Sequence, residues 1–303
     1  MVARHEDRPK SKFFIDNLFD DFISLSGDRF YGEDKSVLTG FAKFNGTSVL
    51  VIGQEKGENL ETRIERNFGM MRPEGYRKTI RLMNLANKFN IPIISFIDTP
   101  GAYPGVGAEE RGQAEAIAKS IECCMELSVP TLAIIIGEGG SGGAIALASS
   151  NKVIMLENAI YSVISPEGCA TILWRDPKKM LDAAKAMKLS AKDLLELKVI
   201  DEIIPEPLGG AHRDRDQMLE SLRESISKNL NYFKDLSFEE IMNERKNKFL
   251  KIGRNQGFIS NFEDLSTLTI KNNNFKTIFK SKKVLIASTI AGLFILLIAF
   301  SFF

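Results

Sequence analysis

The sequence predicts an α/β fold, in which apolar strands alternate with amphipathic helices. Two runs carry this prediction, Ile91–Ile97 and Pro130–Ile136, because both are apolar enough for buried parallel strands. Each run leads into a glycine-rich segment that opens a helix, over residues 97–107 and 136–143. Of the 303 residues, 44% are hydrophobic and 26% are charged, so the chain can bury a sizeable core.

The other elements follow in chain order. Gly40–Gly57 has the pattern of a β-hairpin, because Asn45-Gly46 supplies two residues with positive φ for a tight turn. Arg72–Asn90 has helical spacing of its apolar residues, with Pro73 near the start. The sequence further predicts a helix over 113–127, a short helix ending near 150, strands at 152–157 and 159–165, a helix-turn-strand unit over 190–207, and an amphipathic helix over 212–230.

The segment Gly137–Gly143 contains five glycines in seven residues and fits three kinds of site. The first is a dinucleotide site: Gly137, Gly139 and Gly142 obey the G-x-G-x-x-G pattern. Glu157 then lies where a ribose-binding acid would lie. Only about eight residues remain for the helix that follows, which is short for such a fold.

A serine hydrolase is the second interpretation. Gly139-x-Ser141-x-Gly143 fits the nucleophile elbow, and Asp201 and His212 follow in the chain order of that class. His212 lies in a charged stretch that is typical of an exposed loop or a helix start. Spacing alone does not bring three side chains together, so this alternative stays open.

The third interpretation requires only backbone. A helix N-terminus presents N–H groups that have no intrahelical partner, and the helix dipole adds positive potential there. Glycine lets a ligand approach these groups because it has no Cβ. No lysine follows the glycines as a Walker A loop requires. The segment therefore predicts an oxyanion hole made of peptide N–H groups.

Five long segments extend this evidence along the chain: "RNFGMMRPEGYRK", "FIDTPGAYPGVGAEERGQAEAIA", "IGEGGSGGAIAL", "YSVISPEGCATILW" and "VIDEIIPEPLGGAHRD". In this order they resemble the carboxyltransferase alpha subunit family of bacterial-type acetyl-CoA carboxylase, over about residues 3–253. The resemblance implies a crotonase-like (ClpP/crotonase) fold, a superhelix of ββα repeats. It also implies transfer of a carboxyl group from carboxybiotin to acetyl-CoA, giving malonyl-CoA, the first committed step of fatty acid synthesis.

The same resemblance implies roles for eight residues of this sequence. Gly142 and Gly143 are expected to supply the catalytic backbone N–H groups of the oxyanion hole. Substrate binding is expected of the residues around them, which are Gly139, Gly140, Gly101, Ala102, Tyr103 and Pro104. Gly139 and Gly140 are expected to shape the glycine loop. Gly101 and Ala102 are expected to form a facing wall, and Tyr103 and Pro104 to pack around the biotin ring.

Partners are implied in the same way. In this family the alpha subunit pairs with a beta subunit in an α2β2 assembly with the active site between them, so activity is expected only with beta. The biotin carboxyl carrier protein and biotin carboxylase are the other expected partners. Zinc is expected on beta, while this chain is expected to hold no metal and no tightly bound cofactor. Carboxybiotin and acetyl-CoA are then substrates.

The charge balance and the cysteines limit the other possibilities. Forty Lys+Arg against 39 Asp+Glu give a net charge of +1, which does not suggest a nucleic-acid partner. The three cysteines provide neither a disulfide framework nor a C-x-x-C metal pair, so a reducing cytoplasmic setting is expected. Two interpretations stay open for one basic cluster: it is expected either to contact CoA phosphates or the beta subunit, or to form a solvated helix face. The cluster consists of Arg63, Arg66, Arg72, Arg77, Lys78 and Arg81.

The C-terminal residues Val284–Phe303 carry no charge, and as a helix they would be ~30 Å long, about the thickness of the bilayer core. Four lysines precede them, which by the positive-inside rule keeps the body of the protein on the cytosolic side of a membrane. We therefore expect four regions, namely an N-terminal helical segment 1–36, a crotonase-like carboxyltransferase domain 37–250, a polar linker 251–283 and a transmembrane tail helix 284–303.

Overall fold

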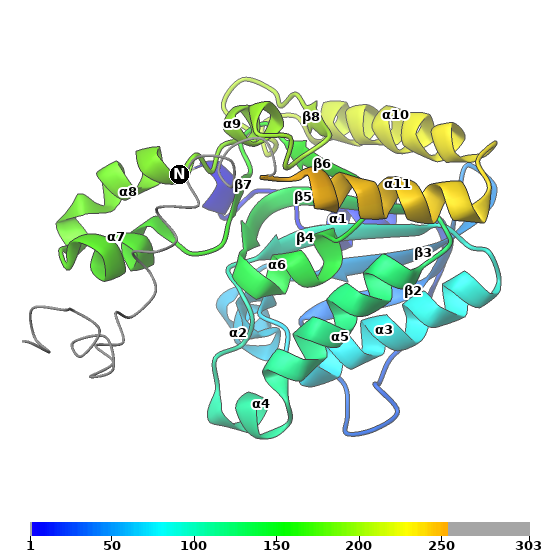
Figure 1. The fold of residues 1–303 in the computed structure, drawn as a ribbon, viewed down its shortest axis with the longest axis horizontal. Helices are drawn as coiled ribbons and strands as arrows, with labels where there is room; N and C mark the ends of the chain where they lie inside the picture. The colour runs from blue at the N-terminus through cyan, green and yellow to red at the C-terminus, as the bar shows by residue number, and fades with distance from the viewer. Residues whose placement is uncertain (1, 254–303) are drawn as a thin grey trace, which may run out of the picture. The chain divides into compact units, whose positions relative to one another are not determined.

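A computed structural model describes residues 2–253, which are built around one mixed β-sheet of eight strands (Figure 1). Seven strands are hydrogen-bonded in the order β1-β2-β3-β4-β5-β6-β8, and β7 pairs with β5 off this path. The strand bounds are β1 Asp20–Ser24, β2 Val37–Phe44, β3 Thr47–Gln54, β4 Ile93–Thr99, β5 Thr131–Gly140, β6 Lys152–Leu156, β7 Ile160–Ser162 and β8 Glu202–Ile204. The α/β fold class is confirmed.

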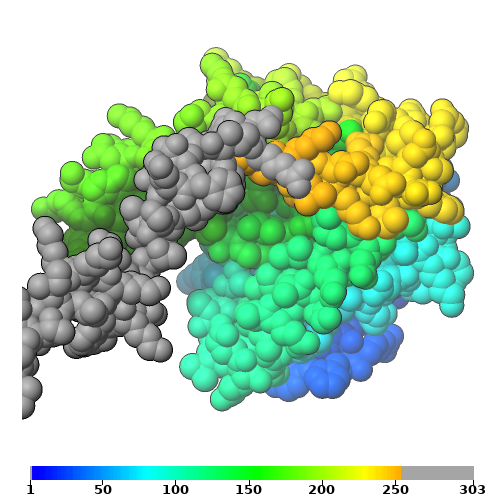
Figure 2. Space-filling model, in the orientation of Figure 1, coloured from blue at the N-terminus to red at the C-terminus, as the bar shows by residue number. Residues whose placement is uncertain are grey.

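Helices cover both faces of this sheet. Their bounds are α1 Ser11–Leu18, α2 Leu60–Glu65, α3 Pro73–Lys88, α4 Val106–Glu110, α5 Gln113–Glu126, α6 Ser141–Ala148, α7 Pro166–Trp174, α8 Met180–Met187, α9 Ala191–Glu196, α10 Arg215–Phe233 and α11 Phe238–Lys251, with short 3-10 helices η1 Val2–Arg4, η2 Asn67–Gly69 and η3 Pro177–Lys179. Helices α3, α5 and α6 pack in succession on one face, and α11 lies beside α5 there (Figure 2). On the other face α1 contacts β3, β4 and α10.

The predicted hairpin is confirmed. Strands β2 and β3 pair antiparallel from Val37↔Gln54 to Phe44↔Thr47. The turn between them has φ of 48° at Asn45 and 79° at Gly46. Both values lie in the left-handed region that a two-residue hairpin turn requires, which is why the Asn-Gly pair stands there.

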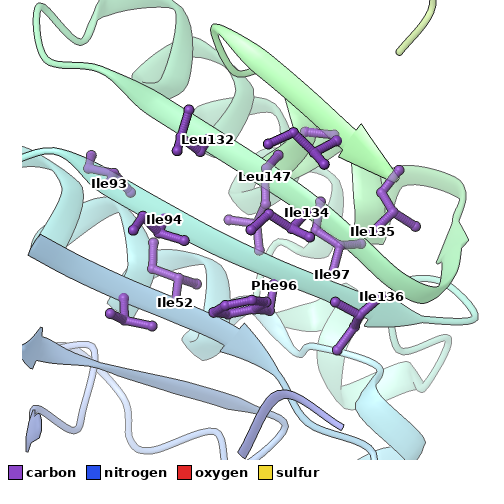
Figure 3. Packing of buried hydrophobic residues seen from close by; sticks show 14 of the residues in the cluster. Ile52, Ile93, Ile94, Phe96, Ile97, Leu132, Ile134, Ile135, Ile136 and Leu147 are labelled. Atoms are coloured by element: carbon purple, nitrogen blue, oxygen red, sulfur yellow. The ribbon is translucent and has the colours of Figure 1, made fainter. Parts of the chain in front are cut away.

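The core is centred on β4 and β5, in which every residue is buried (Figure 3). These strands are parallel neighbours, and their apolar runs face helices on both sides of the sheet. Continuous apolar strands are typical of this arrangement, because neither face meets water. The helices predicted over 72–90 and 113–127 are confirmed as α3 and α5.

Two expectations of local structure are corrected. The segment 1–36 is not only helical, because Asp20–Ser24 forms β1 and pairs with β2. The glycine segment is not a loop throughout, because β5 continues to Gly140, where its backbone pairs with Ser162 of β7. Glycine is tolerated in this strand end because other backbone approaches it closely, as described below.

The dinucleotide-binding interpretation is wrong for this fold. The strands follow one another across the sheet in chain order, with no reversal at which a dinucleotide would bind. Helix α6 is only eight residues long. The carboxylate of Glu157, the expected ribose ligand, accepts a hydrogen bond from the backbone N–H of Glu206 at 3.0 Å.

Most of the expected linker 251–283 and the whole expected tail helix 284–303 lie outside the described residues. Within residues 2–253, every helix is too short or too polar to cross a bilayer. Residues Met1–Ile252 form one compact unit.

Candidate oxyanion site

The two glycine-rich segments meet at one edge of the sheet. Strand β4 runs into residues 100–105 and β5 runs into α6, and the parallel pairing of these strands brings Thr99 opposite Gly139. Because the carboxyl ends of parallel neighbours lie at the same edge, both segments leave the sheet side by side. This meeting point contains the residues expected to form the oxyanion hole.

Gly143 lies in direct contact with the facing segment. A Cβ on Gly143 would lie 2.6 Å from the carbonyl carbon of Gly101, 2.7 Å from its oxygen and 3.0 Å from the nitrogen of Ala102. Likewise, a Cβ on Gly140 would overlap the carbonyl group of Pro100. The two backbones therefore approach to a distance that only glycine permits at positions 140 and 143.

The first turn of α6 presents its N–H groups at this contact. The first N–H groups of a helix have no carbonyl one turn earlier to bind, and Gly140, at the cap position, provides no side-chain acceptor. Ser141 has φ of 51°, a left-handed value that is uncommon for residues other than glycine and that turns the chain sharply from strand into helix. Gly142 is half-buried and Gly143 is buried, so their amides lie in a sheltered place.

Two buried glutamines hold the segments in position. Gln54 Nε2 donates to the carbonyl oxygen of Gly143 at 2.8 Å. Gln113 Nε2 donates to the carbonyl oxygens of Met71 and Tyr103, at 2.8 and 3.1 Å. Sequence reasoning missed both residues; the only signal was a polar side chain at the end of one apolar strand and at the start of one helix. They hold the backbone next to the peptide groups whose N–H atoms the site would use.

The segment 100–105 is stiffened by its own contacts. Thr99 Oγ1 donates to the carbonyl oxygen of Gly101 at 2.7 Å, and the N–H of Gly101 donates back to the same hydroxyl at 3.2 Å. The N–H of Tyr103 donates to the carbonyl oxygen of Met71 at 3.1 Å. The Tyr103 ring is half-buried with the guanidinium of Arg72 4.6 Å from its centroid, whereas Pro104 is exposed.

Gly139 and Gly142 have different surroundings. A Cβ on Gly139 would lie 3.0 Å from Cδ2 of Tyr161, so this glycine makes room for an aromatic ring beside the strand end. A Cβ on Gly142 would lie 3.6 Å from the side chain of Ile117, an ordinary contact. Thus the structure brings together Gly101, Ala102, Gly140 and Gly143, while Gly139 and Gly142 flank them.

The serine hydrolase alternative does not assemble. The Asp201 carboxylate accepts hydrogen bonds from the N–H of Val153 at 2.7 Å and from Nζ of Lys248 at 2.8 Å. The ring of His212 stacks on that of His5, with centroids 3.9 Å apart. Within residues 2–253, Ser141, Asp201 and His212 make no hydrogen bonds with one another, so a nucleophile, base and acid are not aligned.

Half of the basic cluster makes specific contacts within the protein through three residues of α3. Arg77 Nε donates to Asp28 at 2.9 Å, Lys78 binds Glu33, and Arg81 donates to the carbonyl oxygen of Gly27 at 3.0 Å. These contacts attach the segment between β1 and β2 to α3. These three residues therefore do not form a purely solvated face.

Comparisons with known proteins identify the family of this chain. Residues 1–253 match the family described as "Acetyl co-enzyme A carboxylase carboxyltransferase-like". The acetyl-coenzyme A carboxylase carboxyl transferase subunit alpha of Pelagibacter ubique (strain HTCC1062) is 81% identical over 286 residues, which cover 93% of this chain and 78% of the relative. The protein of the same name from Brucella ovis is 56% identical over 254 residues, covering 84% of this chain and 80% of the relative.

Solved structures share the fold at low identity. A transcarboxylase 12S structure superposes with a TM-score of 0.62 and 19% identity, covering 77% of this chain and 43% of the other. The beta subunit of P. aeruginosa geranyl-CoA carboxylase gives a TM-score of 0.57 at 16% identity, covering 81% and 44%. This chain therefore spans less than half the length of either. By its match over most of its length, the chain belongs to the family of acetyl-CoA carboxylase carboxyltransferase alpha subunits.

Proposed function

We propose that this carboxyltransferase alpha subunit works with a beta subunit to transfer a carboxyl group from carboxybiotin to acetyl-CoA, giving malonyl-CoA. In the overall step the bond between the biotin nitrogen and the carboxyl carbon breaks. The methyl carbon of the thioester loses a proton to the biotin nitrogen and gains the carboxyl group. Negative charge passes through oxygen atoms during this exchange, so the protein must stabilise oxyanions rather than provide a nucleophile.

The close approach of Gly143 to the Gly101–Ala102 peptide carries this proposal. Amides at the start of α6 remain available to an oxygen, and the helix dipole adds positive potential there. Gln54 holds the carbonyl group that follows these amides, and Gln113 holds the facing segment, before substrate arrives. Such pre-set donors act without reorganisation, and loss of one in an acyl-transfer enzyme costs about 2.7–4 kcal/mol.

In this proposal Gly142 and Gly143 donate N–H groups to the ureido oxygen of biotin, and Ala102 faces them. Tyr103 and Pro104 lie beside the entrance and contact the biotin ring. Carboxybiotin arrives on the biotin carboxyl carrier protein after biotin carboxylase has loaded it, so neither substrate is a resident cofactor of this chain. Zinc belongs to beta in this scheme.

The beta subunit is the partner that the surface favours most. Helices α7 and α8 project away from the sheet in Figure 1. They and the residues just before α7 expose apolar side chains that are each 67–69% exposed, namely Val163, Ile172, Leu173 and Leu181. Exposed apolar groups of this size are typical of an interface. One chain of a malonate decarboxylase hetero-tetramer from Pseudomonas has the same fold, at a TM-score of 0.59 and 14% identity, covering 71% of this chain and 86% of the other.

Carboxyl transfer by the full chain, mixed with its beta subunit, tests the proposal. The mixture should form malonyl-CoA from carboxybiotin and acetyl-CoA, and either subunit alone should not. Leu173→Asp should weaken the association with beta, as measured by sedimentation, whereas Lys119→Asp on the exposed surface of α5 should not. Full turnover by the alpha chain alone would contradict the shared active site.

Residues 284–303 are proposed to anchor the protein in a membrane, with the catalytic body in the cytoplasm. The support is the absence of charge over these twenty residues and the lysines that precede them. Such an anchor would hold the carboxyltransferase next to the membrane without altering the glycine site.

A further inference from the structure

A cavity of about 220 Å³ lies beside the C-terminal ends of β4 and β5. Its walls come from three places: the N-terminal residues 3–10, the region of α2 and η2, and the strand ends. Pro100 and Glu138 line it, but Gly101, Ala102, Gly142 and Gly143 do not. The cavity is therefore adjacent to the proposed oxyanion site and distinct from it.

Three of the five basic side chains in this cavity are already neutralised by carboxylates. Arg8 makes a two-bond pair with Glu206, at 2.9 and 2.5 Å. Arg4 binds Glu138 at 2.5 Å. Lys56 lies between Asp98, at 2.8 Å, and Glu138, at 3.1 Å. The two buried acids of the cavity wall, Asp98 and Glu138, are therefore both paired with cations.

Lys10 and Arg63 are the two cations left without a carboxylate. Within the described part of the chain, neither forms an ion pair within 4.0 Å, and both have only peptide oxygens as partners. Lys10 Nζ donates to the carbonyl oxygen of Glu6 at 2.9 Å, and Arg63 Nε donates to that of Gly57 at 3.5 Å. Burial and then the charge of Arg63 lower the pKa of Lys10, and the more weakly acting charges of Asp98, Glu55 and Glu58 only partly offset them.

We propose that this cavity binds a small dianion, a phosphate or a compact dicarboxylate, between Lys10 and Arg63. The guanidinium and the ammonium group would each donate charge-assisted hydrogen bonds to it. A volume of about 220 Å³ corresponds to roughly seven water molecules at about 30 Å³ each, which suits an ion of this size. The bound ion would lie against Pro100, the residue before the Gly101–Ala102 wall.

Binding of inorganic phosphate to the full chain tests this assignment. At constant ionic strength, phosphate should give a saturable heat signal by titration calorimetry and should raise the melting temperature, because it binds only the folded state. Lys10→Gln and Arg63→Gln should each weaken binding about tenfold or more, as expected for loss of a charge-assisted hydrogen bond. Lys12→Gln is the matched control, because Lys12 is exposed and pairs with Asp16 at 2.6 Å; it should bind as the unmodified chain does.

Lys10→Arg keeps the charge and should keep binding, which separates loss of the site from loss of the fold. Malonate in place of phosphate shows whether a dicarboxylate fits equally well, and binding of either dianion supports the site. Acetate, a monoanion, should bind more weakly than both. The assignment is overturned if neither dianion binds, if acetate binds as tightly as they do, or if Lys10→Gln and Arg63→Gln bind phosphate as well as Lys12→Gln.

Discussion

Replacing Gly143 by alanine adds one methyl group at the contact between the two segments. That carbon would meet backbone atoms of Gly101 and Ala102 at 2.6–3.0 Å, and backbone cannot rotate away as a flexible side chain can. Overpacking of this kind costs about 1–3 kcal/mol. Alanine recovers about 1 kcal/mol of helix propensity. The net loss of unfolding free energy should therefore not exceed about 2 kcal/mol, which lowers the melting temperature by at most roughly 8 °C in a domain of this size.

Catalysis should suffer much more than stability. Relief of the clash moves the Gly101–Ala102 peptide away from α6, so the amides no longer converge on one oxygen. A misplaced oxyanion donor costs about 10²–10³ in kcat. The assay is malonyl-CoA formation by the variant with its beta subunit. Gly142→Ala is the control for stability, because its Cβ makes only an ordinary contact with Ile117. A Gly143→Ala enzyme with kcat within about twofold of the unmodified enzyme would refute the role given to this contact.

Three further predictions concern other parts of the chain. Ser141→Ala and His212→Ala should each retain most carboxyl transfer in the same assay, because Asp201 is bound to Lys248 and forms no triad with Ser141 and His212. Near-total loss of activity would favour the serine hydrolase interpretation instead. Glu206→Gln should lower the unfolding free energy by about 3–5 kcal/mol at neutral pH, since it leaves buried Arg8 unpaired; a smaller loss by chemical denaturation would contradict this. Deletion of 284–303 should move the protein from the membrane fraction to the supernatant; an unchanged pellet would rule out the anchor.

The Glu206 ion pair also determines how stability depends on pH. Burial opposes ionisation of Glu206, but the hydrogen bonds and charge of Arg8 and the bonds from Asn158 outweigh it, so its pKa is lowered. A carboxyl group whose pKa is lower in the folded state stabilises the protein fully above its ordinary pKa, about 4.3. This stabilisation is lost as the pH falls through the lowered pKa. The Glu206→Gln variant should therefore lose less stability than the unmodified chain on acidification below about pH 4.3.

Local signals made much of the fold predictable. The Asn45-Gly46 pair specifies its own turn. The apolar runs that form β4 and β5 are hydrophobic along their whole length, so their burial could be predicted without knowing which strands lie beside them. The convergence of two glycine segments follows from the same logic, because parallel strands deliver the segments after them to one edge. The meeting place of the two segments could therefore be predicted from the sequence to within a few residues.

Contacts between distant residues could not be predicted. Gln54 reaches Gly143 across 89 positions of the chain, and a polar residue at a strand end does not indicate its partner. Similarly, β1 forms because β2 offers it an edge, although Asp20–Ser24 lacks a regular alternation of apolar residues. The low strand propensity of glycine disfavours the extension of β5 through Gly140, and this extension depends on pairing with β7.

An amide-to-ester replacement at residue 143, in which oxygen takes the place of the peptide nitrogen and its hydrogen, tests the central claim most directly. It removes one N–H donor without adding a side chain to the contact with Gly101. We expect kcat for carboxyl transfer with the beta subunit to fall about 10²–10³-fold while the chain remains folded. An unchanged kcat would mean that this amide does not stabilise the developing negative oxygen.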